Sequence, residues 1–254
     1  DVESLLTVGR FPAFRALDRT ALLLRYPEYF RLRRLTHYQV EETIGRPLRS
    51  RRWQPEKEER LLAADKRWLR REGRHVVWIG DDDYPRGLLR VYDAPPVLYL
   101  RGERGVLADL RRGTTAVAAV GTRRPDDSGR EAAYALGLEA AGAGVTVVSG
   151  LARGIDGYVH RGVVAGGGTA LVVLGSGVDV VYPQEHVDLA ADIVESGGVI
   201  VGEYPPGTPP ARFRFPARNR IIVGIGEGVV LVQAPERSGA LISADVAADI
   251  GVEV

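Results

Sequence analysis

Arginine and glycine recur in five segments of the second half of the chain. Glycine lets backbone N–H groups approach an anion closely, and the arginine guanidinium offers a planar fork of donors that suits phosphate oxygens. One such segment is better explained as a tight turn between a strand and a helix, but several together predict a phosphate-binding surface. Eight of the ten arginines that follow residue 112 lie in or beside these segments: Arg123, Arg124, Arg153, Arg212, Arg214, Arg218, Arg220 and Arg237.

The longest of the five segments, residues 203–220, also carries aromatic side chains. Phe213 and Phe215 alternate there with Arg212 and Arg214. Bases stack on aromatic rings while cations follow the phosphate backbone, so this pattern is typical of single-stranded nucleic-acid binding. An alternative is that one or both rings anchor the segment to the core, and both interpretations stay open.

Several common chemistries lack their sequence signatures. The first strand-to-helix turn has no G-x-G-x-x-G, and no lysine follows Lys66, which excludes a P-loop. The chain has no cysteine, and its four histidines show no H-E-x-x-H spacing. Neither Ser149 nor Ser176 stands in a G-x-S-x-G elbow, and His160 is expected to pack inside a helix. We therefore expect no metal, no cofactor and no catalytic residue.

From residue 114 onward, apolar runs typical of buried strands alternate with stretches typical of helices. This alternation predicts a Rossmann-like parallel α/β sheet with helices on both faces. In such sheets ligands bind beyond the carboxyl ends of the strands. The expected strands are 116–121, 145–150, 170–175, 199–204 and 229–234, and the expected helices lie near 128–142, 156–165, 185–196, 217–226 and 239–250. The segments that leave the strands are 121–129, 149–156, 175–183, 203–220 and 233–241.

The first part of the chain has a different character. Residues 1–70 show helical spacing, broken at Gly9 and Pro12, and predict a small helical domain. Two strands at 75–80 and 95–102 are expected to extend one edge of the sheet, giving a second domain over 71–254. The last four residues, GVEV, are expected to begin a further strand, with part of the natural protein following them.

Charge is divided unequally between the two halves. Residues 1–112 carry 24 basic and 17 acidic side chains, whereas residues 113–254 carry 10 and 16. Arginine replaces lysine almost everywhere, which codon bias would explain as well as phosphate recognition. The chain has neither a signal-peptide pattern nor an apolar run long enough to span a bilayer, so a cytoplasmic location without membrane contact is expected.

Six ordered motifs closely resemble the DprA/Smf family (DNA-processing protein A). The likeness covers residues 84–254, and over residues 1–70 it is at most a weak similarity to the family's SAM-like N-terminal domain. The six motifs are VAAVGTRRPDDSGREAAYALG (117–137), VTVVSGLARGID (145–156), VLGSGVDVVYP (173–183), GEYPPGTPP (202–210), FPARNRIIVG (215–224) and APERSGAL (234–241). The chain departs from the family pattern at Tyr158 and Val159, and the family's C-terminal winged-helix domain is expected to be absent from this chain.

The resemblance implies a non-catalytic protein of natural transformation. Members of the family bind and protect single-stranded DNA and load the RecA recombinase onto it, in some cases displacing single-strand-binding protein, and they commonly act as homodimers. The family's DNA pocket falls here on Gly121, Thr122, Arg123, Arg124, Ser149, Gly150, Arg153, Phe215, Arg218, Asn219 and Arg220. To these the loop chemistry adds Ser176, Gly177, Arg212, Phe213, Arg214, Ser238 and Gly239 as candidate DNA contacts.

Two other interpretations stay open. The chain also fits a Rossmann-like enzyme of the LOG class, which releases the base from nucleoside monophosphates. That class needs a P-G-G-x-G-T loop followed by a glutamate, whereas residues 234–246 contain one glycine and no glutamate after it. Base release from AMP discriminates the two functions. The second interpretation makes residues 1–70 a separate protein-binding module.

Overall fold

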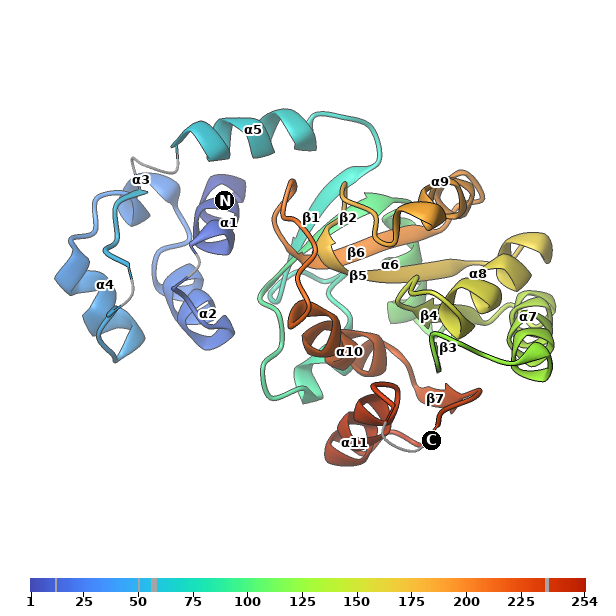
Figure 1. Ribbon diagram of the computed structural model, residues 1–254. Helices are drawn as coiled ribbons and strands as arrows, with labels where there is room; N and C mark the ends of the chain where they lie inside the picture. Colours follow the sequence, from blue (N-terminus) through green and yellow to red (C-terminus); the bar gives the residue numbers. More distant parts are fainter. Residues whose placement is uncertain (12, 50, 56–58, 236–237) are drawn as a thin grey trace.

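A seven-stranded sheet forms the centre of the molecule (Figure 1). The computed structural model describes residues 1–11, 13–49, 51–55, 59–235 and 238–254. The strand order is β1-β2-β6-β5-β4-β3-β7. The strands are β1 (Arg74–Trp78), β2 (Val97–Gly102), β3 (Ala116–Val120), β4 (Thr146–Ser149), β5 (Ala170–Gly177), β6 (Val199–Tyr204) and β7 (Gly228–Leu231).

The five strands of the second half are parallel, and β1 and β2 continue the sheet in antiparallel pairing beside β6. This confirms the Rossmann-like fold and the mixed edge that the sequence predicts. At the carboxyl end, Glu253 forms a single parallel bridge with Gly228, so the expected further strand begins beside β7.

Helices cover both faces of the sheet, so that a hydrophobic core lies on each face. Neighbouring residues along a strand point to opposite faces and therefore into different cores. Val172 of β5 packs in the cluster that contains Val159, whereas Val173 packs in the cluster that contains Ile222. Every residue of β5 is buried, which explains its continuous apolar run. One face carries α7 (Asp127–Gly142), α8 (Ile155–Ala165) and α9 (Val187–Glu195), and the other carries α6 (Gly105–Arg112), α10 (Arg214–Ile225) and α11 (Leu241–Ile250). Two 3-10 turns, η2 (Arg86–Arg90) and η3 (Gln184–His186), complete the order.

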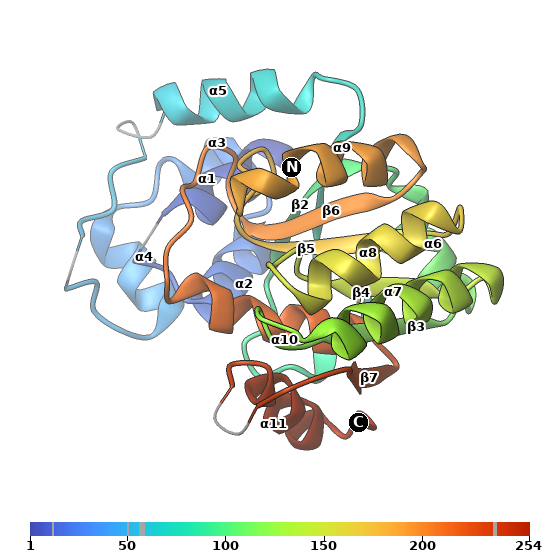
Figure 2. The same ribbon diagram turned by 45° about the vertical axis from the view of Figure 1, so that its right-hand side comes forward.

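The amino-terminal helices lie beside the antiparallel edge of the sheet (Figure 2). They are α1 (Val2–Arg10), α2 (Ala16–Arg25), α3 (Tyr29–Leu32), α4 (His37–Ile44) and α5 (Glu59–Leu69). Trp68 of α5 meets Tyr99 of β2 edge to face, with ring centroids 6.5 Å apart. None of the described helices is long and apolar enough to cross a membrane.

Two expectations about helix boundaries are wrong. Gly9 lies inside α1 and does not break it. A glycine stands there because α1 passes so close to β2 that a Cβ would collide with the Tyr99 hydroxyl. Pro12, the other expected break, lies outside the described residues. Helix α10 begins at Arg214 rather than near residue 217, so the later part of the 203–220 segment is helical. The division of the chain near residue 70 stays a prediction.

The strand order reverses direction at β3. Strand β4, the next along the chain, lies on one side of β3, and β7 lies on the other. A crevice opens at such a switch point because the two connections leave the strand ends in opposite directions. The carboxyl ends of β3 and β7 are therefore where the fold itself places a ligand site.

Candidate functional site

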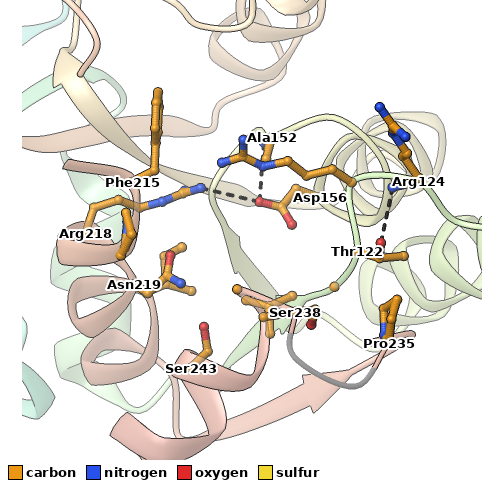
Figure 3. A pocket seen from close by; sticks show the side chains of 17 residues that line it. Thr122, Arg124, Ala152, Asp156, Phe215, Arg218, Asn219, Pro235, Ser238 and Ser243 are labelled. Carbon is orange, nitrogen blue, oxygen red and sulfur yellow. Dashed lines mark hydrogen bonds and ion pairs between the residues drawn. The ribbon is translucent and has the colours of Figure 1, made fainter. Parts of the chain in front are cut away.

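Two adjoining cavities open at this switch point, and Figure 3 shows the larger of them. The larger, which we call the switch-point pocket, has a volume of about 480 Å³. It lies between the turn 121–124 after β3, the first turns of α10 and the residues that lead into α11. The smaller, which we call the aromatic pocket, has about 280 Å³ and extends from Phe215 towards Arg153 and Tyr182.

A buried ion pair forms a wall of the site, in which Arg218 lines both cavities and Asp156 lines the larger. Arg218 of α10 is only 4% exposed, and its guanidinium lies 3.7 Å from the carboxylate of Asp156. Arg218 also donates to the Val173 carbonyl at 2.7 Å. The Asp156 carboxylate accepts from the backbone N–H groups of Gly150 at 3.2 Å and Ala152 at 3.3 Å. The pair therefore ties α10 to β5 and to the loop after β4.

Gly150, in the loop after β4, is required for a steric reason. A Cβ at Gly150 would overlap the Arg218 guanidinium, so only glycine admits the arginine at this depth. Burial raises the pKa of Asp156, while Arg218 and the two backbone N–H groups oppose that rise. Burial also lowers the pKa of Arg218, and Asp156 opposes that change. Each charge is thus compensated mainly by the other, as buried ion pairs require.

The rim of the site is cationic and aromatic. Arg123 and Arg124 are exposed, and among the described residues neither has a carboxylate within ion-pair distance. The Arg123 guanidinium carbon lies 5.4 Å from the centroid of the Phe215 ring. The Tyr182 ring lies 5.3 Å from the same ring at an interplanar angle of 32° and is 42% exposed. Together they form a surface on which a flat, electron-rich group can stack beside a cation.

Tyr182 is a member of this surface that the sequence did not single out. It stands at the end of the 175–183 segment, which was expected to face a ligand. The sequence feature that could have identified Tyr182 is an aromatic residue in a segment beyond the carboxyl end of a strand. Spacing alone did not reveal that its ring would reach Phe215, which comes from a different connection.

The structure brings together eleven of the residues predicted from sequence. Around the switch-point pocket are Gly121, Thr122, Arg123, Arg124, Phe215, Arg218, Asn219, Ser238 and Gly239. Gly150 and Arg153 line the aromatic pocket. Arg153 is held there by Glu185 through two hydrogen bonds of 2.8 and 2.7 Å, but both partners are exposed, so the pair is weak enough to exchange for a ligand.

Three predicted residues are sealed inside the protein instead. The Ser149 hydroxyl donates to the Ala119 carbonyl at 2.6 Å, and the Ser176 hydroxyl donates to the Val180 carbonyl at 2.7 Å. Both serines and Gly177 are buried in their strands. Their small size serves packing and local hydrogen bonding, and a DNA contact by these three residues stays a prediction that their burial does not support.

Four further predicted residues lie outside both cavities. Arg220 forms two hydrogen bonds to Glu203 at 3.0 and 2.7 Å, and so joins α10 to β6. Arg214 stacks over Tyr204, 4.7 Å from its centroid, and Phe213 is 71% exposed. Arg212 is exposed on the same connection. Arg237, also counted among the loop arginines, lies outside the described residues.

The helix N-termini at this edge differ in what they offer to an anion. The first turns of α7, α8 and α9 each contain an aspartate, and Asp126 caps α7 by accepting from Gly129 N–H at 2.8 Å. These carboxylates already occupy the positive ends of their helices. Helices α10 and α11 have neither an acidic residue in the first turn nor a side-chain cap. Among the described helices at this edge, these two leave the positive ends of their dipoles uncompensated by a carboxylate, and both border the switch-point pocket.

His160 is fully buried in α8, and burial lowers its pKa to about 3. The expectation that it packs inside a helix is confirmed. Among the described residues, no group of three or more His, Asp or Glu side chains is placed to hold a metal ion.

The chain is similar to proteins that process DNA. The family model of DNA recombination-mediator protein A matches residues 75–254. Protein Smf of Escherichia coli is 38% identical over 74% of this chain and 49% of its own length. DNA processing protein DprA of Bacillus subtilis is 38% identical over 77% of this chain and 63% of its own. The chain thus spans between about half and two thirds of these two curated relatives.

Solved structures agree with this likeness. DprA from Streptococcus pneumoniae superimposes with a TM-score of 0.72 at 29% identity, covering 98% of this chain and 83% of that one. DprA from Helicobacter pylori, solved to describe a unique single-stranded DNA binding mode, gives 0.62 at 26% identity over 70% and 78% of the two chains. The family resemblance predicted from the motifs is therefore confirmed: the chain belongs to the DNA recombination-mediator protein A family, also called DprA/Smf.

Proposed function

We propose that this chain binds single-stranded DNA without sequence preference, through the two cavities at the switch point. The observation that carries the proposal is the stacking surface of Phe215 and Tyr182 with Arg123 over it. A base of any identity can stack on an aromatic ring, and a nearby guanidinium can meet the backbone phosphate, so such a surface selects single strands rather than sequences.

The surroundings of the surface support this assignment. Phe215 is half-buried on α10, so its ring is held in place before a ligand arrives. Arg123 and Arg124 face solvent beside it, and the open ends of α10 and α11 add positive partial charge. The single-stranded DNA binding described for the Helicobacter pylori relative supports the same substrate class.

We further propose the finer activities that the family implies. The bound strand would be protected and handed to the RecA recombinase, with the chain acting as a homodimer and displacing single-strand-binding protein in natural transformation. The family's description as a recombination mediator supports loading. Strand exchange by the recombinase on DNA coated with single-strand-binding protein measures the loading, and sedimentation of the full chain measures the dimer.

We propose no catalytic role for this site. A base-releasing enzyme needs a carboxylate free to act on the sugar, and among the described lining residues the carboxylate is that of Asp156. That group is buried against Arg218. We expect no base release from AMP, and turnover that survives purification would contradict this part of the proposal.

The proposed function is tested by the binding of matched single- and double-stranded oligonucleotides at two salt concentrations. We expect tighter binding of the single strand, equal for several base compositions, and a linear fall of log affinity with log salt of about 0.7 per phosphate contacted. Equal affinity for both duplex and single strand, or binding that salt leaves unchanged, would overturn the assignment.

A further inference from the structure

The switch-point pocket contains more anion-binding groups than stacking and backbone contacts require. Helix α11 has ten residues and begins at Leu241 with Ala240 at its N-cap, and neither a side-chain cap nor an acidic residue occupies its first turn. The Leu241 and Ser243 N–H groups already donate to the Ser238 and Ala240 carbonyls at 3.1 and 3.0 Å, so α11 offers the pocket the positive end of its dipole rather than a set of free N–H groups. Helix α10 begins on the opposite wall, again without an acidic residue in its first turn, although the Arg214 N–H donates to the Ala211 carbonyl and Pro216 has no N–H.

Ser243 supplies an independent sign of a ligand. Its side chain is fully buried, yet its Oγ has no hydrogen-bond partner among the described residues. Ser243 lines the pocket, and Figure 3 shows its hydroxyl directed towards the space beside Asn219. A buried hydroxyl without a partner costs about 1–3 kcal/mol, and such groups are rare in native proteins. This hydroxyl is thus placed to donate to an acceptor that enters the pocket.

Two further polar atoms share this condition. Ser238 Oγ and Arg218 Nε are buried and have no partner among the described residues, and both side chains border the same pocket. All three atoms can donate a hydrogen bond, so together they favour an acceptor-rich ligand. The carboxylate in the wall does not repel such a ligand, because Asp156 is paired with Arg218.

The size of the pocket limits what the ligand can be. Its volume of about 480 Å³ lies at the small end of the range for ligand sites, which is about 300–1,000 Å³. That space suits one phosphorylated sugar with its base, not a run of nucleotides. Two open helix ends, with Arg123 and Arg124 at the mouth, also match a dianion better than the single charge of a backbone phosphodiester.

We propose that the switch-point pocket binds a nucleotide phosphate monoester, with the Ser243 hydroxyl donating to one of its oxygens at the positive end of α11. Two sources share this chemistry: the phosphorylated end of a single strand and a free nucleoside monophosphate. The first source rests on the proposed function, because the rest of the strand would continue over Phe215 and Tyr182. The free mononucleotide does not depend on it.

The test compares oligo-dT that carries a 5′-phosphate, a 3′-phosphate or only hydroxyl ends, each titrated with the full chain. We expect one phosphorylated end to bind about tenfold more tightly than the hydroxyl-ended strand, which corresponds to one or two charge-assisted hydrogen bonds. Ser243→Ala should remove that gain, so that phosphorylated and hydroxyl-ended oligo-dT bind the variant equally. Its fold should be retained, because the lost hydroxyl has no partner in the protein.

The matched control is Ser196→Ala, which removes a hydroxyl bonded to the Asp192 carbonyl at the far end of α9 and should leave the gain intact. A second variant, Ser243→Asp, places a carboxylate at the end of α11 and should abolish the gain. Thymidine monophosphate, titrated alone with thermal unfolding as the readout, should raise the Tm of the wild-type chain but not that of Ser243→Ala.

The outcomes separate the two proposals. Binding of thymidine monophosphate without any end preference assigns the pocket to free nucleotide. If neither an end preference nor mononucleotide binding is seen while hydroxyl-ended oligo-dT still binds, the monoester site is overturned. The proposed function then stands. Failure of every oligonucleotide overturns the proposed function, and the mononucleotide titration then decides the monoester site by itself.

Discussion

The wall and the rim of the site use the same side chain in opposite surroundings. In the wall, Arg218 is 4% exposed and is bound by Asp156 and the Val173 carbonyl. On the rim, Arg123 and Arg124 face solvent, and Arg123 touches an aromatic ring. The difference teaches that an arginine beside a ligand pocket stabilises the fold when its charge is buried and compensated. An arginine that is exposed and unpaired is available to bind the ligand. Substitutions in the wall should therefore lower stability, and those on the rim should lower affinity.

The largest effect is expected for Asp156→Ala. This change leaves Arg218 as an uncompensated buried charge, which costs about 3–5 kcal/mol of the free energy of unfolding. At the size of this chain the loss should lower the Tm by roughly 10 °C. Thermal unfolding measures it, with Asp127→Ala as the control because that carboxylate is 91% exposed. Equal Tm values for the two variants would show that the Asp156–Arg218 ion pair does not stabilise the fold.

A smaller loss is expected for Gly150→Ala. The added methyl group overlaps the Arg218 guanidinium, so the wall must shift, at a cost of about 1–3 kcal/mol for overpacking. Gly142→Ala is the control, since a Cβ there meets nothing within 4 Å. Denaturant unfolding should show the first variant destabilised and the second unchanged or slightly more stable. A tolerated Gly150→Ala would mean that Arg218 is free to move.

The buried His160 leads to a prediction about how the stability of the fold depends on pH. Burial lowers its pKa to about 3, below the ordinary value of 6.5. The unfolded chain therefore binds a proton that the folded chain does not, and stability falls as the pH drops below about 6.5, by up to about 1.4 kcal/mol per pH unit. His160→Leu should flatten this fall between pH 6.5 and 5. Identical pH profiles for variant and wild type would show that other groups cause the acid sensitivity.

On the rim, Phe215→Leu should weaken binding of single strands without lowering the Tm by a comparable amount. Loss of stacking is worth about 1–3 kcal/mol per base and should apply to all base compositions alike. Phe213→Leu provides the comparison, because Phe213 is exposed on the same connection but lines neither cavity. Anisotropy titrations in which the second variant loses more affinity than the first would move the stacking site to the 205–213 loop.

The sheet and the place of the site could be predicted from the sequence. Apolar runs bounded by glycine and proline indicated each parallel strand, and the carboxyl ends of those strands placed the arginine-rich segments at one edge. The boundary of α10 was harder: the helix was predicted near residues 217–226, whereas it begins at Arg214 and includes Pro216. Proline is tolerated in the first turn of a helix, where its missing N–H has no partner to lose.

The division of the arginines into wall and rim could not be predicted. Arg218 and Arg123 look alike in a sequence, and what separates them is contact with Asp156, which lies 62 positions before Arg218. The buried serines were missed for a similar reason. Ser149 and Ser176 stand in motifs beside the site, but they lie in strands whose residues are all buried, and their hydroxyls donate to the Ala119 and Val180 carbonyls.

The central claim is that the rim arginines bind the backbone of a single strand. It is tested most directly by the affinity of oligo-dT across a salt series for wild type, Arg123→Ala and Arg112→Ala. Arg112 is an exposed arginine at the end of α6, just before β3 begins and so at the opposite edge of the sheet. We predict that Arg123→Ala binds roughly tenfold more weakly at low salt and has a salt slope smaller by about 0.7, with an unchanged Tm, while Arg112→Ala matches wild type. Wild-type affinity and slope in Arg123→Ala would contradict the account.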